Sequence, residues 1–165
     1  MNKLILCEGA TDAILLSYYL ERTAGWKFVR QPPQGVSIRA TEQNEEVTWY
    51  KKNNDYLLIC AVGGKDNFGK FFDDKIQKPL VMSDAFEKIA IVADRDNREV
   101  SEIETEASAF LKVPCGTIKN NQWNDCSYTN EFRMEKTFSA LLVVIPQEQQ
   151  GALETAMLAA IAEDP

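Results

Sequence analysis

Four apolar runs divide the chain, and polar residues follow each of them. The runs cover residues 2–7, 56–62, 89–93 and 139–146. Short apolar runs that end in turn-forming residues are typical of strands buried on both faces of a parallel sheet. Between them, apolar residues recur at the spacing of amphipathic helices. This alternation predicts an α/β fold in which helices flank a central, mostly parallel sheet.

Helices are expected in five stretches of the chain. They are a segment of about a dozen residues from residue 10, residues 67–75, 79–86 and 98–112, and a segment from residue 151. Gly9 lets the backbone turn tightly before the first helix because it has no Cβ atom. Thr11 or Asp12 can then cap that helix with a side-chain oxygen. The chain therefore begins with the strand-turn-helix unit from which doubly wound sheets are built.

Residues 26–62 are richer in β-forming residues than the rest of the chain. Proline, glycine and asparagine separate several short runs there, and these residues are turn formers. The runs are residues 26–31, 36–41, 45–52 and 56–62. We expect them to be strands, including a hairpin that turns at residues 52–55. Residues 31–56 are therefore interpreted as a β-hairpin insertion into the α/β fold.

The length and composition are those of one globular domain. The chain has 165 residues, of which 45% are hydrophobic and 26% charged, so it can bury a substantial core. We expect a single domain over residues 1–165, with residues 113–165 as a C-terminal extension. The chain stops directly after its last predicted helix, which leaves a truncated chain as an alternative. The sequence has no apolar stretch of membrane-spanning length and no secretory signal, which predicts a cytoplasmic protein without a membrane partner.

The absence of histidine restricts the chemistry. It excludes a histidine general base, a Ser-His triad and a His-ligated zinc site. Cys7, Cys60, Cys115 and Cys126 include no CxxC pair, and we expect reduced, largely buried thiols rather than zinc ligands. The net charge of −7 repels polyanions. A nucleic-acid partner therefore requires a local basic patch, bound cations or a basic partner protein.

Carboxylates follow two of the predicted strands. Glu8 comes directly after the first strand, and Asp94 and Asp96 follow the run at residues 89–93. In open α/β sheets, ligands bind at the carboxyl ends of the strands. Side chains alternate along an extended segment, so Asp94 and Asp96 are expected to point to the same side. Such an all-oxygen cluster suits Mg²⁺ or Mn²⁺. The alternative is a solvated strand-to-helix turn in which Asp96 or Asn97 caps the helix.

A double glycine and a lysine follow the run at residues 56–62. Gly63 and Gly64 between a buried strand and a helix permit a close approach of the backbone to a ligand. Lys65 can reach a phosphate, and the first amides of the helix after Gly9 form a weakly positive pole suited to phosphate. The alternatives are a simple tight connection and a lysine that only solvates the loop.

Two motifs together resemble the toprim domain. They are LILCEGATD in the first β-α unit and IVADRD at the later strand end. Topoisomerases, bacterial primases, small ribosomal-RNA-processing nucleases and OLD-type nucleases share this domain. Glu8 matches the glutamate after the family's first strand, and Asp94 and Asp96 match its Asp-x-Asp pair. Asp12 matches the second acid of the E-G-x-[TS]-[DE] form. The resemblance covers about residues 1–112 and implies a Rossmann-like toprim fold.

The sequence departs from parts of the toprim family. The predicted insertion at residues 31–56 makes the gap between the motifs longer than in compact members. A topoisomerase tyrosine context, a zinc ribbon and a helicase-binding region are not evident in the sequence. The best match is therefore a stand-alone toprim-like protein near the OLD-type and small toprim nucleases. OLD-type enzymes use further acids late in the chain, and Glu154 is matched to one of them. A helix-start glutamate that complements the helix dipole is the alternative.

The resemblance implies Mg²⁺- or Mn²⁺-dependent phosphodiester hydrolysis or phosphoryl transfer on DNA, RNA or a nucleotide, reached alone or through a protein partner. The expected metal ligands are Glu8, Asp12, Asp94, Asp96 and Glu154. The expected catalytic residues are Glu8, Asp94, Asp96 and Lys65. The expected phosphate-binding residues are Gly9, Gly63, Gly64, Lys65 and Arg95.

Three alternatives stay open at this point. Arg95 can pair with a neighbouring acid instead of a phosphate. The chain can also be a non-catalytic toprim-like module that binds metal, nucleotide or a protein partner, or a structural domain with a solvated acidic edge. Fold similarity alone does not distinguish catalysis from binding.

Overall fold

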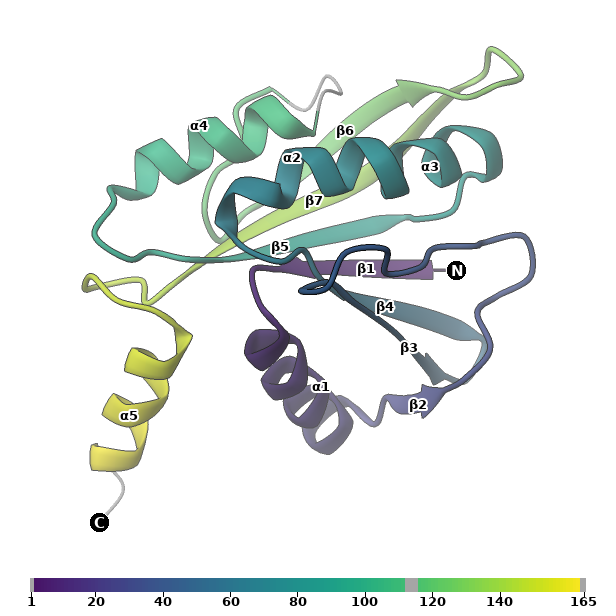
Figure 1. Cartoon of the computed structure of the whole chain (residues 1–165). Coiled ribbons are helices and arrows are strands. Elements are labelled where there is room, and N and C mark those ends of the chain that lie inside the picture. The colour runs from purple at the N-terminus through teal and green to yellow at the C-terminus, as the bar shows by residue number, and fades with distance from the viewer. Residues whose placement is uncertain (1, 112–115, 164–165) are drawn as a thin grey trace.

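A seven-stranded sheet forms the centre of the computed structural model, which describes residues 2–111 and 116–163 (Figure 1). The strands are β1 (Asn2–Cys7), β2 (Lys27–Val29), β3 (Glu46–Lys52), β4 (Asp55–Ala61), β5 (Lys88–Asp94), β6 (Trp123–Thr129) and β7 (Glu135–Ile145). Their order in the sheet is β2-β3-β4-β1-β5-β7-β6. The inner strands β4, β1, β5 and β7 are parallel, and the outer pairings are antiparallel. The predicted α/β class is therefore confirmed.

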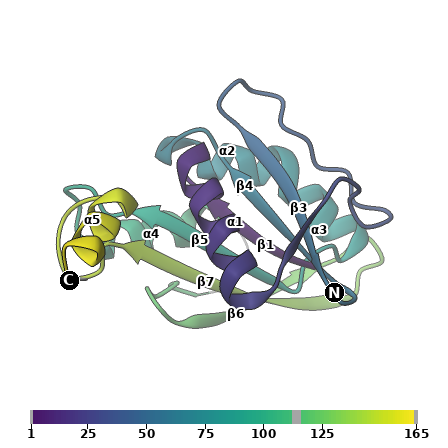
Figure 2. The same ribbon diagram turned by 90° about the horizontal axis from the view of Figure 1, so that it is seen from below.

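Helices cover both faces of this sheet (Figures 1 and 2). They are α1 (Ala10–Ala24), α2 (Phe68–Phe71), α3 (Gln77–Ser83), α4 (Val100–Phe110) and α5 (Leu153–Glu163). α1 lies on one face, whereas α2, α3 and α4 lie on the other. A π-helical turn, Phe72–Ile76, joins α2 to α3. α5 extends away from the end of β7.

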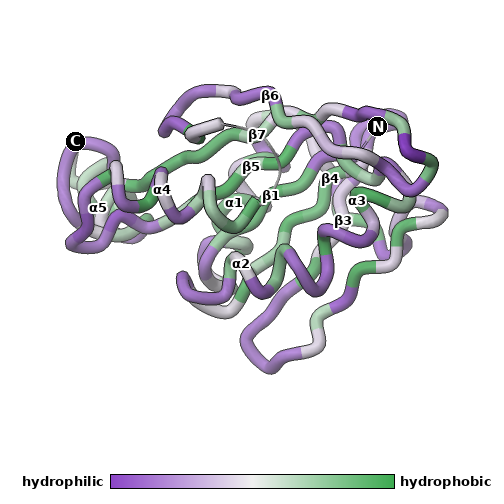
Figure 3. The backbone as a smooth tube through the Cα atoms, turned by 90° about the horizontal axis from the view of Figure 1, so that it is seen from above, coloured by the Kyte–Doolittle hydropathy of each residue, from purple (hydrophilic) through white to green (hydrophobic). Residues whose placement is uncertain are grey.

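Alternating side chains of the strands divide the core into two hydrophobic clusters. In β1, Leu4 and Leu6 belong to the larger cluster under α2, α3 and α4. Cys7 belongs to the smaller cluster, which α1 covers, and Ile5 packs against it. Successive residues of a strand point to opposite faces, so a strand that is apolar at every position can serve both clusters. Figure 3 shows the resulting band of hydrophobic strands through the middle of the molecule.

Most predicted elements are present, but the strand expected at residues 36–41 is not. Those residues contain no strand, although Val36 and Ile38 are both buried at 6% exposure. Their alternation therefore reflects packing of a loop on the core, not pairing with another strand. The predicted turn at residues 52–55 is present and contains Asn53 with a φ of 55°. The hairpin it closes, β3-β4, belongs to the main sheet.

The cysteine prediction is correct in part. Cys7 and Cys60 are free and buried. Cys126 is buried as well, but it is disulfide-bonded, so the prediction of a reduced thiol is wrong for this residue. Cys115 and the end of the helix predicted at residues 98–112 lie outside the described residues. Within residues 2–111 and 116–163, no helix is long and apolar enough to cross a membrane.

Candidate functional site

Glu8 and Asp94 meet at the carboxyl ends of neighbouring strands. β1 and β5 pair in parallel, with Cys7 opposite Val92. The chain therefore leaves both strands at the same edge of the sheet. There, Glu8 Oε1 accepts a hydrogen bond from the Asp94 amide at 2.9 Å. The fold thus brings together the two motifs singled out in the sequence.

A cavity of about 560 Å³ opens at this edge of the sheet, and we call it the acidic cavity. Its lining includes four of the five predicted metal ligands, namely Glu8, Asp12, Asp94 and Glu154. Residues 43–46 form another part of its wall and add Glu45 and Glu46. The sequence does not indicate this segment as part of the site, because its position depends on how a loop folds back. The only local signal was a pair of acids at the start of β3.

Asp12 is a buried residue of the acidic cavity, at 6% exposure. Its Oδ2 accepts a hydrogen bond from the Gly9 amide at 2.8 Å. Gly9 is the N-cap of α1, so Asp12 supports the helix start from the first turn and does not itself occupy the cap position.

The start of α5 completes the acidic cavity. The Leu153 amide donates a hydrogen bond to Asp94 Oδ1 at 2.9 Å. Asp96 and Gly151 exchange two backbone hydrogen bonds of 2.6 and 2.8 Å. These contacts hold the first turn of α5 against the end of β5 and bring Glu154 into the cavity lining. Glu154 therefore lies at a helix start, as the alternative interpretation expected, and also faces the other acids.

Asp96 does not line the acidic cavity with Asp94, and it lacks the extended backbone on which the expectation of a shared side depended. β5 ends at Asp94, and Asp96 has a left-handed φ of 53° that turns the chain. Asp94 lines the acidic cavity, whereas Asp96 Oδ2 pairs with Lys65 Nζ at 3.0 Å outside its lining. The hydrogen bond with Asp96 raises the pKa of Lys65. Lys65 is thus a fixed cation beside the cavity.

The amides predicted to bind phosphate already have protein partners. The Gly63 and Gly64 amides donate to the Glu8 carbonyl at 3.1 and 2.9 Å. The Gly9 amide donates to Asp12. The positive φ values of Gly63 (82°) and Gly64 (122°) explain why glycines occupy this turn. The amides of Gly63 and Gly64 therefore hydrogen-bond the end of β4 to the Glu8 backbone. Because these amides are already engaged, the phosphate-binding role predicted for them is not supported.

The Arg95 side chain links the segment after β5 to the segment after β7. Its side chain donates to the carbonyl oxygens of Arg98 at 3.2 Å and Gln147 at 3.0 Å. It also forms an ion pair with Glu99 at 3.7 Å. The alternative of an acidic partner is the one observed, and the predicted phosphate-binding role of Arg95 is not supported.

Burial and mutual repulsion make the acids of the cavity hard to ionise. Burial raises the pKa of Glu8 to about 7, and repulsion from Asp94 and Asp96 adds to this effect against the hydrogen bond from the Asp94 amide. Burial also raises the pKa of Asp94 to about 6, together with repulsion from Asp12 and Glu154. A bound cation would relieve this repulsion. A chain without histidine thus has groups that titrate near neutral pH.

The donor set suits a hard divalent cation. Within the described part of the chain, Glu8 Oε2 and Asp94 Oδ2 accept no hydrogen bond from protein. No group of three or more Asp, Glu or Cys side chains among those residues is close enough to hold a metal ion. Mg²⁺ commonly uses one or two carboxylates and completes its shell with water and substrate phosphates. Glu8 and Asp94 fit that mode, whereas an all-protein cage does not.

The comparisons with known proteins support the fold alone. No family model and no curated protein matches the chain. The structure is similar to that of a hypothetical protein from Pyrococcus horikoshii OT3, with a TM-score of 0.64 and 19% sequence identity over 98% of this chain and 67% of that chain. A lactoylglutathione lyase from Agrobacterium tumefaciens aligns over 85% of this chain and 92% of that chain, with 14% identity and a TM-score of only 0.26. The second similarity is too weak to bear on fold or function.

Proposed function

We propose that this protein is a toprim-like, Mg²⁺- or Mn²⁺-dependent phosphodiester hydrolase or phosphotransferase that acts on nucleic acid or a nucleotide. The observation that carries the proposal is the contact between Glu8 and the Asp94 amide at the wall of a cavity that Asp12 and Glu154 also line. Such a convergence of carboxylates at the carboxyl edge of a parallel sheet is a common setting for ligand and cation binding.

The residues in and around the acidic cavity would have different roles in the reaction. Glu8 and Asp94 would hold the cation, and Asp12 and Glu154 would add negative charge around it. When bound, the cation would polarise the scissile phosphate and activate water, which needs no histidine base. Lys65, held by Asp96 at the rim, would contact a phosphate of the substrate. Residues 43–46 would limit the access of bulk water to the reacting phosphate.

A second candidate function is a non-catalytic toprim-like module that binds a cation or a nucleotide. Two observations favour it. In residues 2–111 and 116–163, no three carboxylates converge into a ready-made metal site. Asp96, one half of the Asp-x-Asp pair, is engaged by Lys65. Such a module would bind Mn²⁺ or nucleotide without turnover.

A cleavage screen distinguishes these two functions. Wild-type protein is incubated with Mg²⁺ or Mn²⁺ and with single-stranded and duplex DNA, RNA and nucleoside triphosphates. We expect cleavage that disappears with EDTA and falls at least about 100-fold in Asp94→Asn. The matched control is Glu131→Gln, which removes one exposed carboxylate from the turn between β6 and β7. Cation binding without cleavage of any substrate would favour the module, and equal activity of Asp94→Asn would reject the assigned site.

A further inference from the structure

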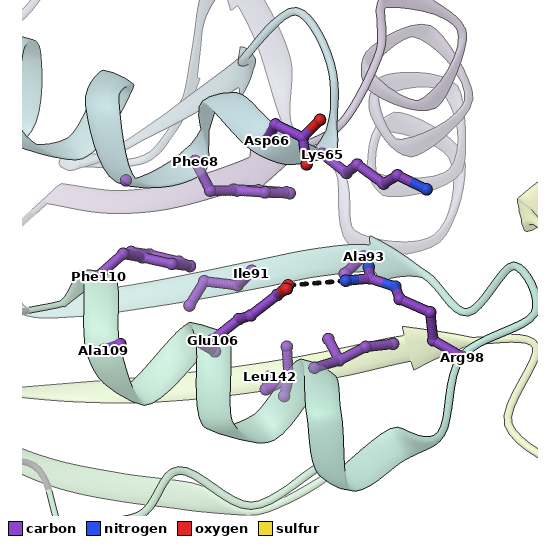
Figure 4. Close-up of a pocket in the computed structure, with 13 residues that line it drawn as sticks. Lys65, Asp66, Phe68, Ile91, Ala93, Arg98, Glu106, Ala109, Phe110 and Leu142 are labelled. Atoms are coloured by element: carbon purple, nitrogen blue, oxygen red, sulfur yellow. Dashed lines mark hydrogen bonds and ion pairs between the residues drawn. The ribbon is translucent and has the colours of Figure 1, made fainter.

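A second cavity lies between α2 and α4, and Lys65 is one of its lining residues (Figure 4). We call it the α2–α4 cleft. It has a volume of about 370 Å³. Ile91 and Leu142 from the sheet form its floor. Phe68 and Phe110 form its closed end, with stacked rings whose centroids are 5.7 Å apart and whose planes differ by 10°.

Four charged side chains surround the open end of the α2–α4 cleft. Lys65 and Asp66 lie on one side, and Arg98 and Glu106 lie across from them (Figure 4). Arg98 donates to Glu106 at 2.7 Å. The two cations and two anions balance, so the cleft does not favour a free anion. An apolar interior with a few polar groups at its rim is typical of sites for small organic groups.

The Arg98–Glu106 pair keeps hydrogen-bonding capacity beyond its own contact. Arg98 Nη1 donates to Glu106 Oε2. A guanidinium has five N–H donors and a carboxylate has a second oxygen, so the pair can offer a donor and an acceptor side by side. Arg98 Nε is not that donor, because it is buried from solvent.

We propose that the α2–α4 cleft binds a nucleobase of the substrate while the adjoining phosphate lies at the acidic cavity. The inference rests on the proposed function for its substrate class. A nucleobase has a flat face that can pack on the partly exposed ring of Phe110. A ring nitrogen or carbonyl oxygen at its edge accepts from a terminal nitrogen of the Arg98 guanidinium, and an exocyclic amino group donates to Glu106. Lys65 lines the cleft and also pairs with Asp96, so it lies where the phosphate would connect the two cavities.

The spacing between α2 and α4 supports a fixed cleft. A Cβ atom on Gly69 would lie 3.3 Å from Phe110 Cβ, slightly closer than an ordinary contact, so α2 and α4 are closely packed at this point. Ala109 lines the cleft from α4 and is exposed, so a larger side chain there can enter the cleft without disturbing the core.

Calorimetry with simple probes tests the proposal. The probes are AMP, GMP, CMP and UMP, with ribose 5-phosphate as the probe that lacks a base. All titrations contain EDTA, so they do not depend on cation binding or turnover. At least one of the four nucleotides should bind about tenfold more tightly than ribose 5-phosphate. Equal or undetectable binding of all five probes at millimolar concentration would overturn the proposal.

Two variants locate the binding site. Ala109→Leu, which keeps a good helix former on α4, should lower nucleotide affinity about tenfold by filling the cleft. Thr105→Leu, on the same helix but outside the cleft lining, is its control. Arg98→Lys keeps the charge and removes the planar guanidinium with its several donors, so it should lower nucleotide affinity but not ribose 5-phosphate affinity. Unchanged nucleotide affinity in Ala109→Leu would place the base elsewhere.

The failure of this inference is distinguishable from the failure of the proposed function. Loss of base selectivity with intact cation-dependent cleavage would reject only the cleft. Base binding in EDTA without any Mn²⁺ binding would reject the metal-dependent function and leave the cleft as a nucleotide site.

Discussion

The Glu8 carboxylate and the Asp94 backbone amide form a 2.9 Å hydrogen bond across 86 positions of the sequence. The donor is neutral, so the contact holds the carboxylate in place without cancelling its charge. The Asp94 side chain is held in the same way by the Leu153 amide. Backbone amides therefore keep two repelling carboxylates at one sheet edge, a costly arrangement that a cation would stabilise.

Removing either carboxylate should weaken cation binding. In Glu8→Gln, the new amide oxygen can still accept from the Asp94 amide, so the fold should persist while the charge is lost. We expect Mn²⁺ affinity to fall at least about tenfold in Glu8→Gln and Asp94→Asn, measured by calorimetry. Glu131→Gln should bind like the wild type. Wild-type affinity in both site variants would show that Mn²⁺ binds elsewhere.

The cation-free protein should lose stability as the pH rises. Glu8 and Asp94 have pKa values of about 7 and about 6 in the folded state, against 4.5 and 3.8 as ordinary values. Between about pH 4 and pH 7 the folded state binds more protons than the unfolded state, so the free energy of unfolding decreases across this window. We expect a decrease of roughly 1–2 kcal/mol, because solvent screens these partly exposed groups.

Urea unfolding in EDTA at several pH values measures this effect. The double variant Glu8→Gln/Asp94→Asn should show a flatter pH dependence than the wild type. Mn²⁺ should restore stability above pH 7 in the wild type and not in the variant. Parallel pH curves for the two proteins would contradict the assigned pKa shifts.

Gly151 should matter to the acidic cavity although it carries no side chain. Its φ is 144°, and a Cβ atom there would lie 2.8 Å from Thr155 Oγ1. Gly151→Ala should therefore shift the start of α5, lower stability by about 1–3 kcal/mol and weaken Mn²⁺ binding. Gly35→Ala, with a φ of 86° and no atom within 4 Å of the added Cβ, provides the matched control. It should lower stability less and leave Mn²⁺ affinity unchanged, so equal effects of both variants would contradict the role of Gly151.

The positive charge of Lys65 should contribute to the affinity for a nucleic acid. For a single-stranded substrate, Lys65→Met should reduce the slope of log affinity against log salt by about 0.7, the contribution of one phosphate contact. Fluorescence anisotropy at several salt concentrations gives this slope. Lys52→Met, at the exposed turn between β3 and β4, is the control and should keep the wild-type slope. An unchanged slope in Lys65→Met would show that Lys65 serves only to hold Asp96.

The ion pair of Lys75 with Glu45 should hold the loop wall of the acidic cavity. The Lys75 and Glu45 side chains are only 11% and 6% exposed. The Thr41 and Glu42 amides also donate to Glu45. Lys75→Met would leave a buried carboxylate without its counter-charge, and we expect a loss of about 3 kcal/mol in thermal or urea unfolding. Lys75→Met/Glu45→Gln should recover part of that loss, whereas an additive loss would contradict the pairing.

The strands that carry the site were predictable from the sequence, because buried parallel strands appear as continuous apolar runs. The apolar runs that end at Cys7 and Ala93 are continuous, so they marked buried strands, and the acids directly after them had to lie at the sheet edge. The placement of Glu154 followed from the toprim resemblance, not from its local sequence. Its position in the structure depends on backbone contacts of Gly151 and Leu153 with the end of β5.

The features that were missed depend on tertiary contacts. The left-handed turn at Asp96 replaces the expected extended backbone, and aspartate at such a position carries little signal. The amides of Gly63 and Gly64 turn to the Glu8 carbonyl, which no pattern within that loop could indicate. No local pattern singles out Arg98, because its importance depends on its position beside a cleft between α2 and α4, which are distant in sequence.

The hydrogen bond from the Leu153 amide to Asp94 also affects when the site can form in the nascent chain during translation. A ribosome makes β1 and β5 long before it makes β7 and α5, although β5 lies between β1 and β7 in the finished sheet. Until residue 153 has left the exit tunnel, Asp94 lacks the amide that holds its carboxylate, and one edge of β5 is bare. The acidic cavity therefore cannot assemble until residue 153 has emerged, and any cation-dependent activity begins only after that point.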